Sequence, residues 1–266
     1  MIVLMLGSGP NVMASRDWPR AAFDRIVTIN NAWAVRPDWD YLVFPDDFPP
    51  ERRPLDLRPE QTLIPSDVYV PENNRYGGVV YAGATMAFSA SYWALGALRP
   101  RVIGYLGCDM VYGTGATHFY GMGTADPLRP DPTLQNLRAK AARLELLAAR
   151  DGCALVNLSK DASVLSFPRA GLDLLPSVAP RTGIADHIAP ALAAERKLGA
   201  ICPSGRYWDG PPLDAAALAE IDALWLAAHD AVHGTAVTPP AARPLPPIGS
   251  DGLSGHNGAA RPPHPA

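Results

Sequence analysis

A short apolar run that opens directly into a glycine turn constrains this chain more than any other feature. Residues 1–6 are all apolar, and Gly7, Gly9 and Pro10 follow at once. A fully apolar run of this length is typical of a strand buried on both faces, as in a parallel sheet covered by helices. Glycine permits a sharp turn, and free N–H groups at such a turn can bind an anion. The stretch predicts a strand followed by either a nucleotide cradle or a plain tight turn.

Further apolar runs alternate with helical patterns along the chain, which favours an α/β fold with a Rossmann-like parallel sheet and covering helices. Strands are expected near residues 25–30, 41–44, 101–106 and 153–157, with one more within 61–65. Helices are expected near residues 15–23, 83–97, 132–150, 184–198 and 213–233, and irregular structure over 48–80. Ser15 and Asp131 are the expected N-caps of their helices, and Gly96 the expected C-cap.

The sequence divides into three parts by composition. Residues 1–180 carry the alternating pattern and form the predicted nucleotide-binding core. Residues 181–234 read as a helical pair that serves as a lid or an oligomer contact. Residues 235–266 are rich in Pro, Gly and Ala with almost no large apolar side chains, so we expect a disordered tail.

Composition excludes several classes of protein. A net charge of −3 carries no electrostatic footprint for nucleic acid. Three widely spaced cysteines argue against a disulfide framework and a cysteine-only zinc site, and no metal-ligand set is identified. No signal peptide and no membrane-spanning run is visible, so a cytoplasmic location is expected.

Polar residues follow the predicted strands, where ligands gather in a parallel sheet. Asn30 and Asn31 close the second strand, and amides suit a ribose or a base edge. Asp46 and Asp47 follow the third strand, where carboxylates can hold a divalent cation against a diphosphate. The pair at 38 and 40 precedes that strand and so lies at the opposite edge. Solvent-exposed loop acids are the simpler interpretation of all four carboxylates.

A long loop over residues 110–130 is rich in glycine and aromatic residues and contains Tyr112 and His118. Long ordered loops in compact domains are usually functional. An unperturbed histidine titrates near pH 6.5, so His118 can accept a proton at neutral pH. The alternative is that His118 only packs within the loop.

Four motifs occur in order: the glycine turn at 7–11, Asn30, a small-residue helix over 83–96, and a strand ending in Asp109 with an aromatic residue beyond. In this order they resemble the bacterial sialyltransferases of glycosyltransferase family 42. They are also similar to a wider Gly-x-Gly-Pro-Ser group that includes motility accessory factors and an archaeal pterin pyrophosphokinase. The resemblance covers about residues 1–160.

The resemblance implies transfer of a sugar from a CMP-type donor to a glycan hydroxyl, with no cofactor required. Carried onto this sequence, it gives as nucleotide contacts Gly7, Ser8, Gly9 and Asn30, with the adjacent Pro10 and Asn31, and Gly83 beside them. It places Asp109 and Tyr112 at the phosphate and makes His118 the general base. The turn departs from the family pattern, with Ser8 where an Asn is usual and Asn11 where a Ser is usual.

Two other functions stay open at this point. One is a Mg²⁺-dependent pterin or nucleotide diphosphokinase-like enzyme, which would need Asp46, Asp47 or Asp109. The other is a non-catalytic nucleotide-binding module of the same fold. Either form could be a homo-oligomer.

Overall fold

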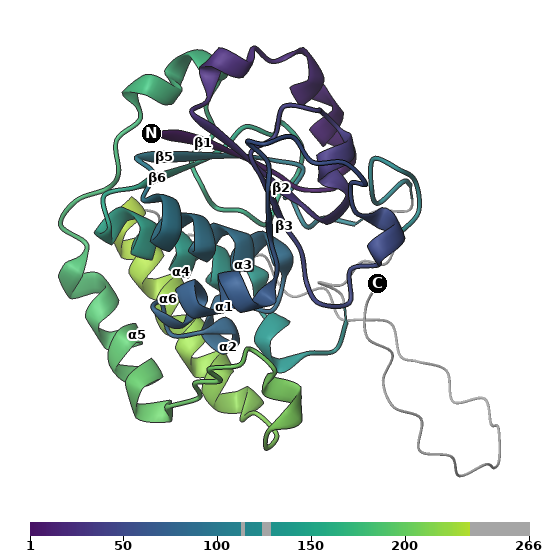
Figure 1. Ribbon diagram of the computed structural model, residues 1–266. Helices are drawn as coiled ribbons and strands as arrows, with labels where there is room; N and C mark the ends of the chain where they lie inside the picture. Colours follow the sequence, from purple (N-terminus) through teal and green to yellow (C-terminus); the bar gives the residue numbers. More distant parts are fainter. Residues whose placement is uncertain (113–114, 124–128, 235–266) are drawn as a thin grey trace, which may run out of the picture.

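The chain folds around one parallel sheet, as a computed structural model shows (Figure 1). The structure describes residues 1–112, 115–123 and 129–234. The expected tail at 235–266 lies outside these residues. The six strands of the sheet are β1 (Ile2–Leu6), β2 (Arg25–Ile29), β3 (Tyr41–Val43), β4 (Thr62–Ile64), β5 (Val102–Leu106) and β6 (Ala154–Asn157). The predicted α/β class and all the expected strands are confirmed.

Strand β1 lies at the centre of the sheet, whose order is β4-β3-β2-β1-β5-β6. Leu4 pairs with Ile26 of β2 on one side and with Gly104 of β5 on the other, all in parallel. The chain therefore builds outward from β1 in one direction and then returns to build in the other. The reversal between β1 and β5 is a topological switch point, where ligands of open α/β sheets bind.

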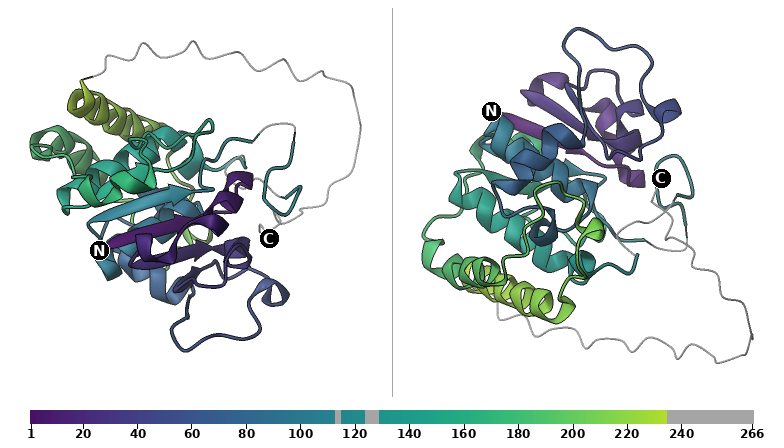
Figure 2. Two further views of the ribbon diagram at one scale, coloured as in Figure 1. Left: turned by 90° about the horizontal axis from the view of Figure 1, so that it is seen from above. Right: turned by 60° about the horizontal axis from the view of Figure 1, so that its bottom comes forward.

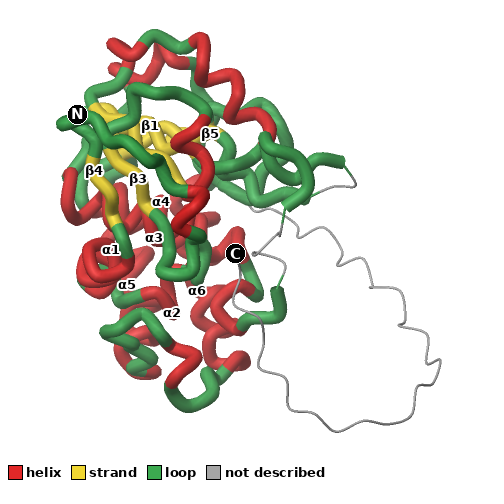
Figure 3. Tube along the Cα trace, turned by 45° about the vertical axis from the view of Figure 1, so that its right-hand side comes forward, coloured by secondary structure: helices red, strands yellow, loops and turns green. Residues whose placement is uncertain are grey.

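Alternate residues of β1 belong to two separate cores. Val3 and Met5 join the cluster beneath the α-helices, whereas Leu4 and Leu6 join a second cluster on the opposite face. All the α-helices lie on the first face, and 3₁₀ segments with loops cover the other (Figure 3). Burial on both faces explains why the strand sequence is wholly apolar.

The helices that cover the sheet are α1 (Ser66–Asn74), α2 (Val79–Ala82), α3 (Met86–Trp93), α4 (Leu137–Arg150), α5 (Ala185–Leu198) and α6 (Ala215–His233). Two start later than expected. Thr85 caps α3 by accepting from the Phe88 N–H, and Asn136 caps α4 by accepting from the Ala139 N–H. Asp131 is an N-cap as expected, of the short 3₁₀ turn that precedes α4.

Three local predictions were wrong. Residues 48–80 are not irregular throughout, since they contain α1 and α2. Ser15 caps no helix; it lies inside a 3₁₀ helix over Pro10–Asp17 and donates to the Val12 carbonyl. Gly96 is not a C-cap, because the helix continues past it as a π-helical turn. The turn ends at Arg99, which takes a left-handed conformation with a φ of 51°.

Helices α5 and α6 pack on α4 and share its core. Trp225 of α6 is fully buried, and its indole N–H donates to Glu195 of α5. Glu195 also pairs with the buried Arg143 of α4, at 2.7 Å. Segment 181–234 is thus attached to the core by apolar packing and buried charges, and its roles as lid or oligomer contact stay predictions. Within the described residues, no helix has the length and apolar character that crossing a bilayer requires.

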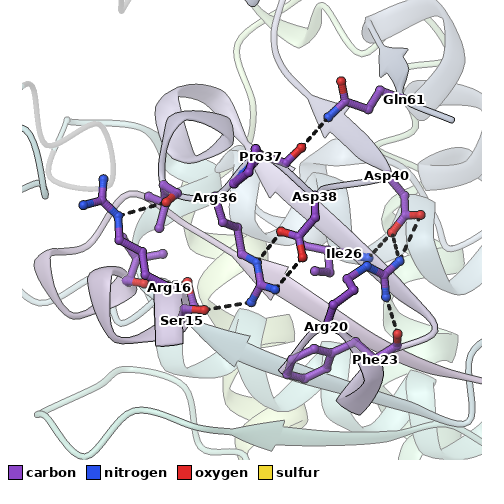
Figure 4. Close-up of polar contacts among 12 residues, drawn as sticks. Ser15, Arg16, Arg20, Phe23, Ile26, Arg36, Pro37, Asp38, Asp40 and Gln61 are labelled. Carbon is purple, nitrogen blue, oxygen red and sulfur yellow. Dashed lines mark hydrogen bonds and ion pairs between the residues drawn. The ribbon is translucent and has the colours of Figure 1, made fainter. Parts of the chain in front are cut away.

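The carboxylates at positions 38 and 40 form ion pairs and hydrogen bonds near the amino ends of the strands (Figure 4). Arg36 makes two hydrogen bonds of 2.7 Å to Asp38, which holds the pKa of that carboxyl below its usual value. Asp40 pairs with Arg20 at 2.9 Å and accepts from the Ile26 N–H. The prediction that they lie at the edge opposite the strand ends is confirmed, but they are ion-paired rather than free loop acids.

Candidate functional site

A cleft of about 990 Å³ lies at the carboxyl ends of the central strands. The glycine turn after β1, Asn30 and Asn31 after β2, and residues 107–112 after β5 all line it. Residues of the loop at 116–123 line it as well. Figure 2 shows this teal loop beside the purple turn after β1, and a hydrogen bond of 2.9 Å from Phe119 N–H to the Ser8 carbonyl joins them. The cleft therefore occupies the switch point of the sheet.

The glycines of the turn are required by the protein backbone itself. A Cβ on Gly7 would lie 2.3 Å from the Gly107 carbonyl oxygen, and one on Gly9 would lie 2.9 Å from the same atom. The Gly9 N–H donates to that oxygen at 2.8 Å, so the turns after β1 and β5 are in direct contact. Gly107 itself has a φ of +73°. The Gly-x-Gly pattern thus first serves close packing of two turns, and this packing forms the cleft floor.

Asn30 combines backbone strain with an unsatisfied polar atom. Its φ is 50°, which is uncommon for a residue with a side chain, although asparagine tolerates it better than most. Its side-chain Oδ1 is buried and has no hydrogen-bond partner among the described residues. A buried unpaired oxygen costs free energy, and strained residues of this kind cluster at ligand sites. Asn30 lines the cleft and therefore carries an unused acceptor beside it.

Asn11 ties three strand ends together. Its Nδ2, whose two protons are shared among three acceptors, lies 2.7 Å from Asp109, 2.9 Å from Ser159 Oγ and 2.9 Å from Asp161. Two carboxylates therefore converge on one amide at the cleft wall. The Asn11 Oδ1 is buried and unpaired among the described residues. Ser159 and Asp161 follow β6, and their contact with the glycine turn was not predicted from the sequence.

His118 lines the cleft from a tight turn in which His118 and Gly121 exchange backbone hydrogen bonds of 3.0 Å. Its ring stacks on Tyr120 at 4.9 Å between centroids, and the Tyr112 ring lies 6.4 Å away. Nδ1 is 2.8 Å from Thr117 Oγ1, a contact that can hold the ring proton on Nδ1 and leave a lone pair on Nε2. Burial lowers the pKa of His118. A neutral imidazole with a lone pair is the form that accepts protons.

Two further lining residues of the cleft were not predicted from the sequence. Trp33 and Arg52 line the cleft, and the Trp33 indole N–H donates to the Arg52 carbonyl at 2.8 Å. Arg52 is exposed and forms no ion pair among the described residues. An aromatic ring beside a cation suits a base and a phosphate. Trp33 follows Asn31 closely and could have been found by the strand-end rule, whereas no local pattern singles out Arg52.

Of the predicted site residues, the cleft brings together nine: Gly7, Ser8, Gly9, Pro10, Asn30, Asn31, Asp109, Tyr112 and His118. Gly83 is not among the lining residues. It is buried against Lys140, and its φ of +87° explains the glycine. Asp46 and Asp47 also lie outside the lining, and Asp46 accepts a hydrogen bond from Ser66 at the start of α1.

No protein-family model matches the chain, and searches of curated proteins and of solved structures return no significant match. The resemblance to sialyltransferases therefore rests on the sequence motifs alone.

Proposed function

We propose that this protein is a nucleotide-sugar-dependent glycosyltransferase that uses a CMP-type donor. The observation that carries the proposal is the convergence of the glycine turn, the strained Asn30 and the His118 loop on one cleft at the switch point. These are the residues that the sialyltransferase resemblance assigns to the nucleotide and the base. The choice of cytidine and of a sialic acid-like sugar comes from the resemblance.

The cleft offers a group for each part of the donor. Asn30 lines the cleft, and its unpaired Oδ1 can accept from a ribose hydroxyl or an exocyclic amine of the base once the side chain turns toward the ligand. Trp33 offers an aromatic surface, and Arg52 a cation for the phosphate. A cleft of about 990 Å³ is large enough for a nucleotide-sized ligand.

In the proposed transfer, the acceptor hydroxyl oxygen bonds to the anomeric carbon while the bond from that carbon to the phosphate oxygen breaks. CMP leaves with the bonding electron pair. His118 Nε2 takes the hydroxyl proton, and Arg52 stabilises the charge that develops on the phosphate. Tyr112 and Asp109 also line the cleft.

One observation favours a second candidate, a Mg²⁺-dependent diphosphokinase-like activity. Asp109 and Asp161 both contact Asn11 Nδ2, so two carboxylates lie at one place in the cleft. Carboxylates together with the Asn11 carbonyl oxygen are the ligands that Mg²⁺ prefers, once the amide turns over. A nucleotide-binding module without catalysis would keep Asn30 and Arg52 but not depend on His118.

Ligand-induced stabilisation separates these functions, since binding raises the melting temperature by mass action. We expect CMP to stabilise the chain in EDTA more than UDP, ATP or a pterin does. Arg52→Gln should weaken CMP binding by about tenfold to a hundredfold, the worth of a charged hydrogen bond. Arg58→Gln is the matched control, because Arg58 is exposed nearby but lies outside the cleft lining.

Donor turnover is then measured with CMP-linked sugars. Release of CMP that requires His118 supports the transferase. If only ATP or a pterin with Mg²⁺ raised the melting temperature, and Asp109→Asn abolished that effect, the diphosphokinase would be the better assignment than the transferase. Binding of CMP without turnover of any donor would leave the binding module.

A further inference from the structure

A cluster of one carboxylate and two imidazoles lies between α4 and α6, apart from the cleft. Glu145 of α4 accepts from His229 Nε2 through one oxygen and from His233 Nε2 through the other, both at 3.0 Å. The three side chains are 6%, 12% and 13% exposed. One ligand atom from each lies within 4.8 Å of the other two. Three potential metal ligands are therefore already gathered in a largely buried place.

The helices hold these ligands in a suitable arrangement. His229 and His233 are four residues apart on α6, so they project from one face, and their rings stack at 4.1 Å between centroids. Glu145 approaches from the facing helix. Zinc binds histidine nitrogen and carboxylate oxygen at about 2.0–2.2 Å, which places neighbouring ligand atoms somewhat more than 3 Å apart. A small widening of the present contacts would admit the ion.

We propose that Glu145, His229 and His233 form a binding site for a divalent transition metal, with zinc the best fit. Two imidazoles and one carboxylate are ligands that zinc commonly takes, and three protein ligands leave the fourth tetrahedral position for water. Calcium and magnesium prefer oxygen ligands and are a poor match.

Metal binding requires a change in the ring protons. An ionised carboxylate only accepts hydrogen bonds, so each ring now presents Nε2–H to Glu145. The metal takes the Nε2 lone pairs, and the protons move to Nδ1. At His229, Asp230 lies 3.9 Å from Nδ1 and favours a proton there. At His233, Arg181 donates to Nδ1 at 2.8 Å and must swing away. Arg181 is exposed, so it is free to do so.

The site would fix the last turn of α6 to α4. His233 is the final residue of α6, and Gly234 ends the helix in a left-handed conformation. A bond from the metal to Glu145 connects this turn to the middle of α4. Arg181, which contacts His233, also lines a hollow of about 540 Å³.

The test uses the full chain, free of purification tags and stripped with EDTA. Zinc is titrated against a chromogenic chelator, and Co²⁺ replaces it for absorption spectroscopy. We expect one metal per chain and nitrogen–oxygen coordination in the cobalt spectrum. His229→Ala combined with His233→Ala should lose more than about 100-fold in affinity, since even supporting residues of metal sites are worth 10–100-fold.

Three further variants sharpen the result. His187→Ala is the matched control, because His187 is an exposed histidine on the neighbouring α5 and lies outside the cluster. Glu145→Gln keeps the shape and hydrogen bonding of the side chain but loses the anionic ligand, so it should bind more weakly. Arg181→Ala removes a positive charge from His233 and should bind more tightly.

Folding is checked by circular dichroism without metal, and zinc should raise the melting temperature of the parent but not of the double variant. Failure of the parent to compete with the chelator would overturn the site. Equal affinity in the parent and the double variant would place the metal elsewhere. Neither result would bear on CMP binding in the cleft, which is measured in EDTA.

Discussion

Gly9 and Gly107 are in backbone contact: the Gly9 N–H donates to the Gly107 carbonyl at 2.8 Å, and a Cβ on Gly9 would lie 2.9 Å from that oxygen. Neither backbone can yield easily, because each turn continues a central strand. Gly9→Ala should therefore lower the free energy of unfolding by about 1–3 kcal/mol, the usual effect of overpacking. Urea denaturation measures this change.

Gly210→Ala provides the control. Gly210 also has a negative φ, and an added Cβ would make only an ordinary contact at 3.5 Å. It should leave stability within about 0.5 kcal/mol of the parent. Equal stability of the two variants would show that the turns can separate. The larger Gly9→Val should damage the fold and the cleft floor together, because its added atoms meet the Gly107 backbone.

Replacing Asn30 with glycine should raise the stability of the protein and weaken its binding of CMP. Asn30→Gly removes a left-handed residue with a side chain, which relieves up to about 1 kcal/mol of backbone strain. It also removes the unpaired Oδ1, so CMP affinity should fall about tenfold, the worth of one hydrogen bond. Melting temperature and ligand titration are measured on the same sample.

Arg99→Gly is the matched comparison for Asn30. Arg99 has a φ of 51°, is exposed and lies outside the cleft lining. It should gain stability without any change in CMP affinity. If both variants bound CMP like the parent, Asn30 would have no ligand contact.

His118 should govern turnover and its dependence on pH. His118→Ala is expected to lower turnover of the donor by about 10²–10⁴-fold and leave CMP affinity within a few-fold. The neutral imidazole is the active base, and burial lowers the pKa of His118. Activity should therefore persist as the pH falls through 6.5 and decline only at lower pH, through the lowered pKa.

The matching pH–rate profile of the variant should lack this acidic limb. His187→Ala serves as the control, since that histidine is exposed and outside the cleft. An unchanged rate in His118→Ala on a productive donor would show that another group is the base.

The sheet was predictable because its central strands are buried on both faces, which forces largely apolar runs such as residues 3–6 and 102–106. Helix α1 was not. It contains Pro71 and two valines, so its local propensity is poor. Tertiary contacts stabilise this helix instead: the buried Asn73 Nδ2 donates to the Ser89 carbonyl of α3 at 3.0 Å. Packing overrode propensity there.

The site divides in the same way. Residues that follow strands, such as Asn30 and Asp109, were predictable because parallel strands end at one edge. Arg52 is distant in sequence from any strand end, in a proline-rich segment. A hydrogen bond from the Trp33 indole N–H to its carbonyl holds this segment at the cleft. The histidines at 229 and 233 have visible helical spacing, but Glu145 meets them only after α4 and α6 pack. Such pairings depend on tertiary structure.

A buried ion pair links α4 to α6 beside Gly83. Lys140 Nζ lies 2.7 Å from Asp222 Oδ1, and both side chains are nearly inaccessible. Burial lowers the pKa of Lys140 and raises that of Asp222, because both charged forms lose hydration. The second carboxylate oxygen of Asp222 has no hydrogen-bond partner among the described residues. The pair therefore recovers only part of its desolvation cost.

Breaking this pair and replacing it should have opposite consequences. Lys140→Met keeps the stem that packs on Gly83 but leaves Asp222 as an unpaired buried charge, so it should cost about 3–5 kcal/mol of unfolding free energy. Adding Asp222→Leu removes that charge and should restore stability to within about 1 kcal/mol of the parent or above it. Lys160→Met, at an exposed lysine, should change stability by less than about 0.5 kcal/mol. Urea denaturation of all four proteins measures these differences in unfolding free energy. If the double variant were no more stable than Lys140→Met alone, the ion pair itself, rather than packing, would hold α6 on α4.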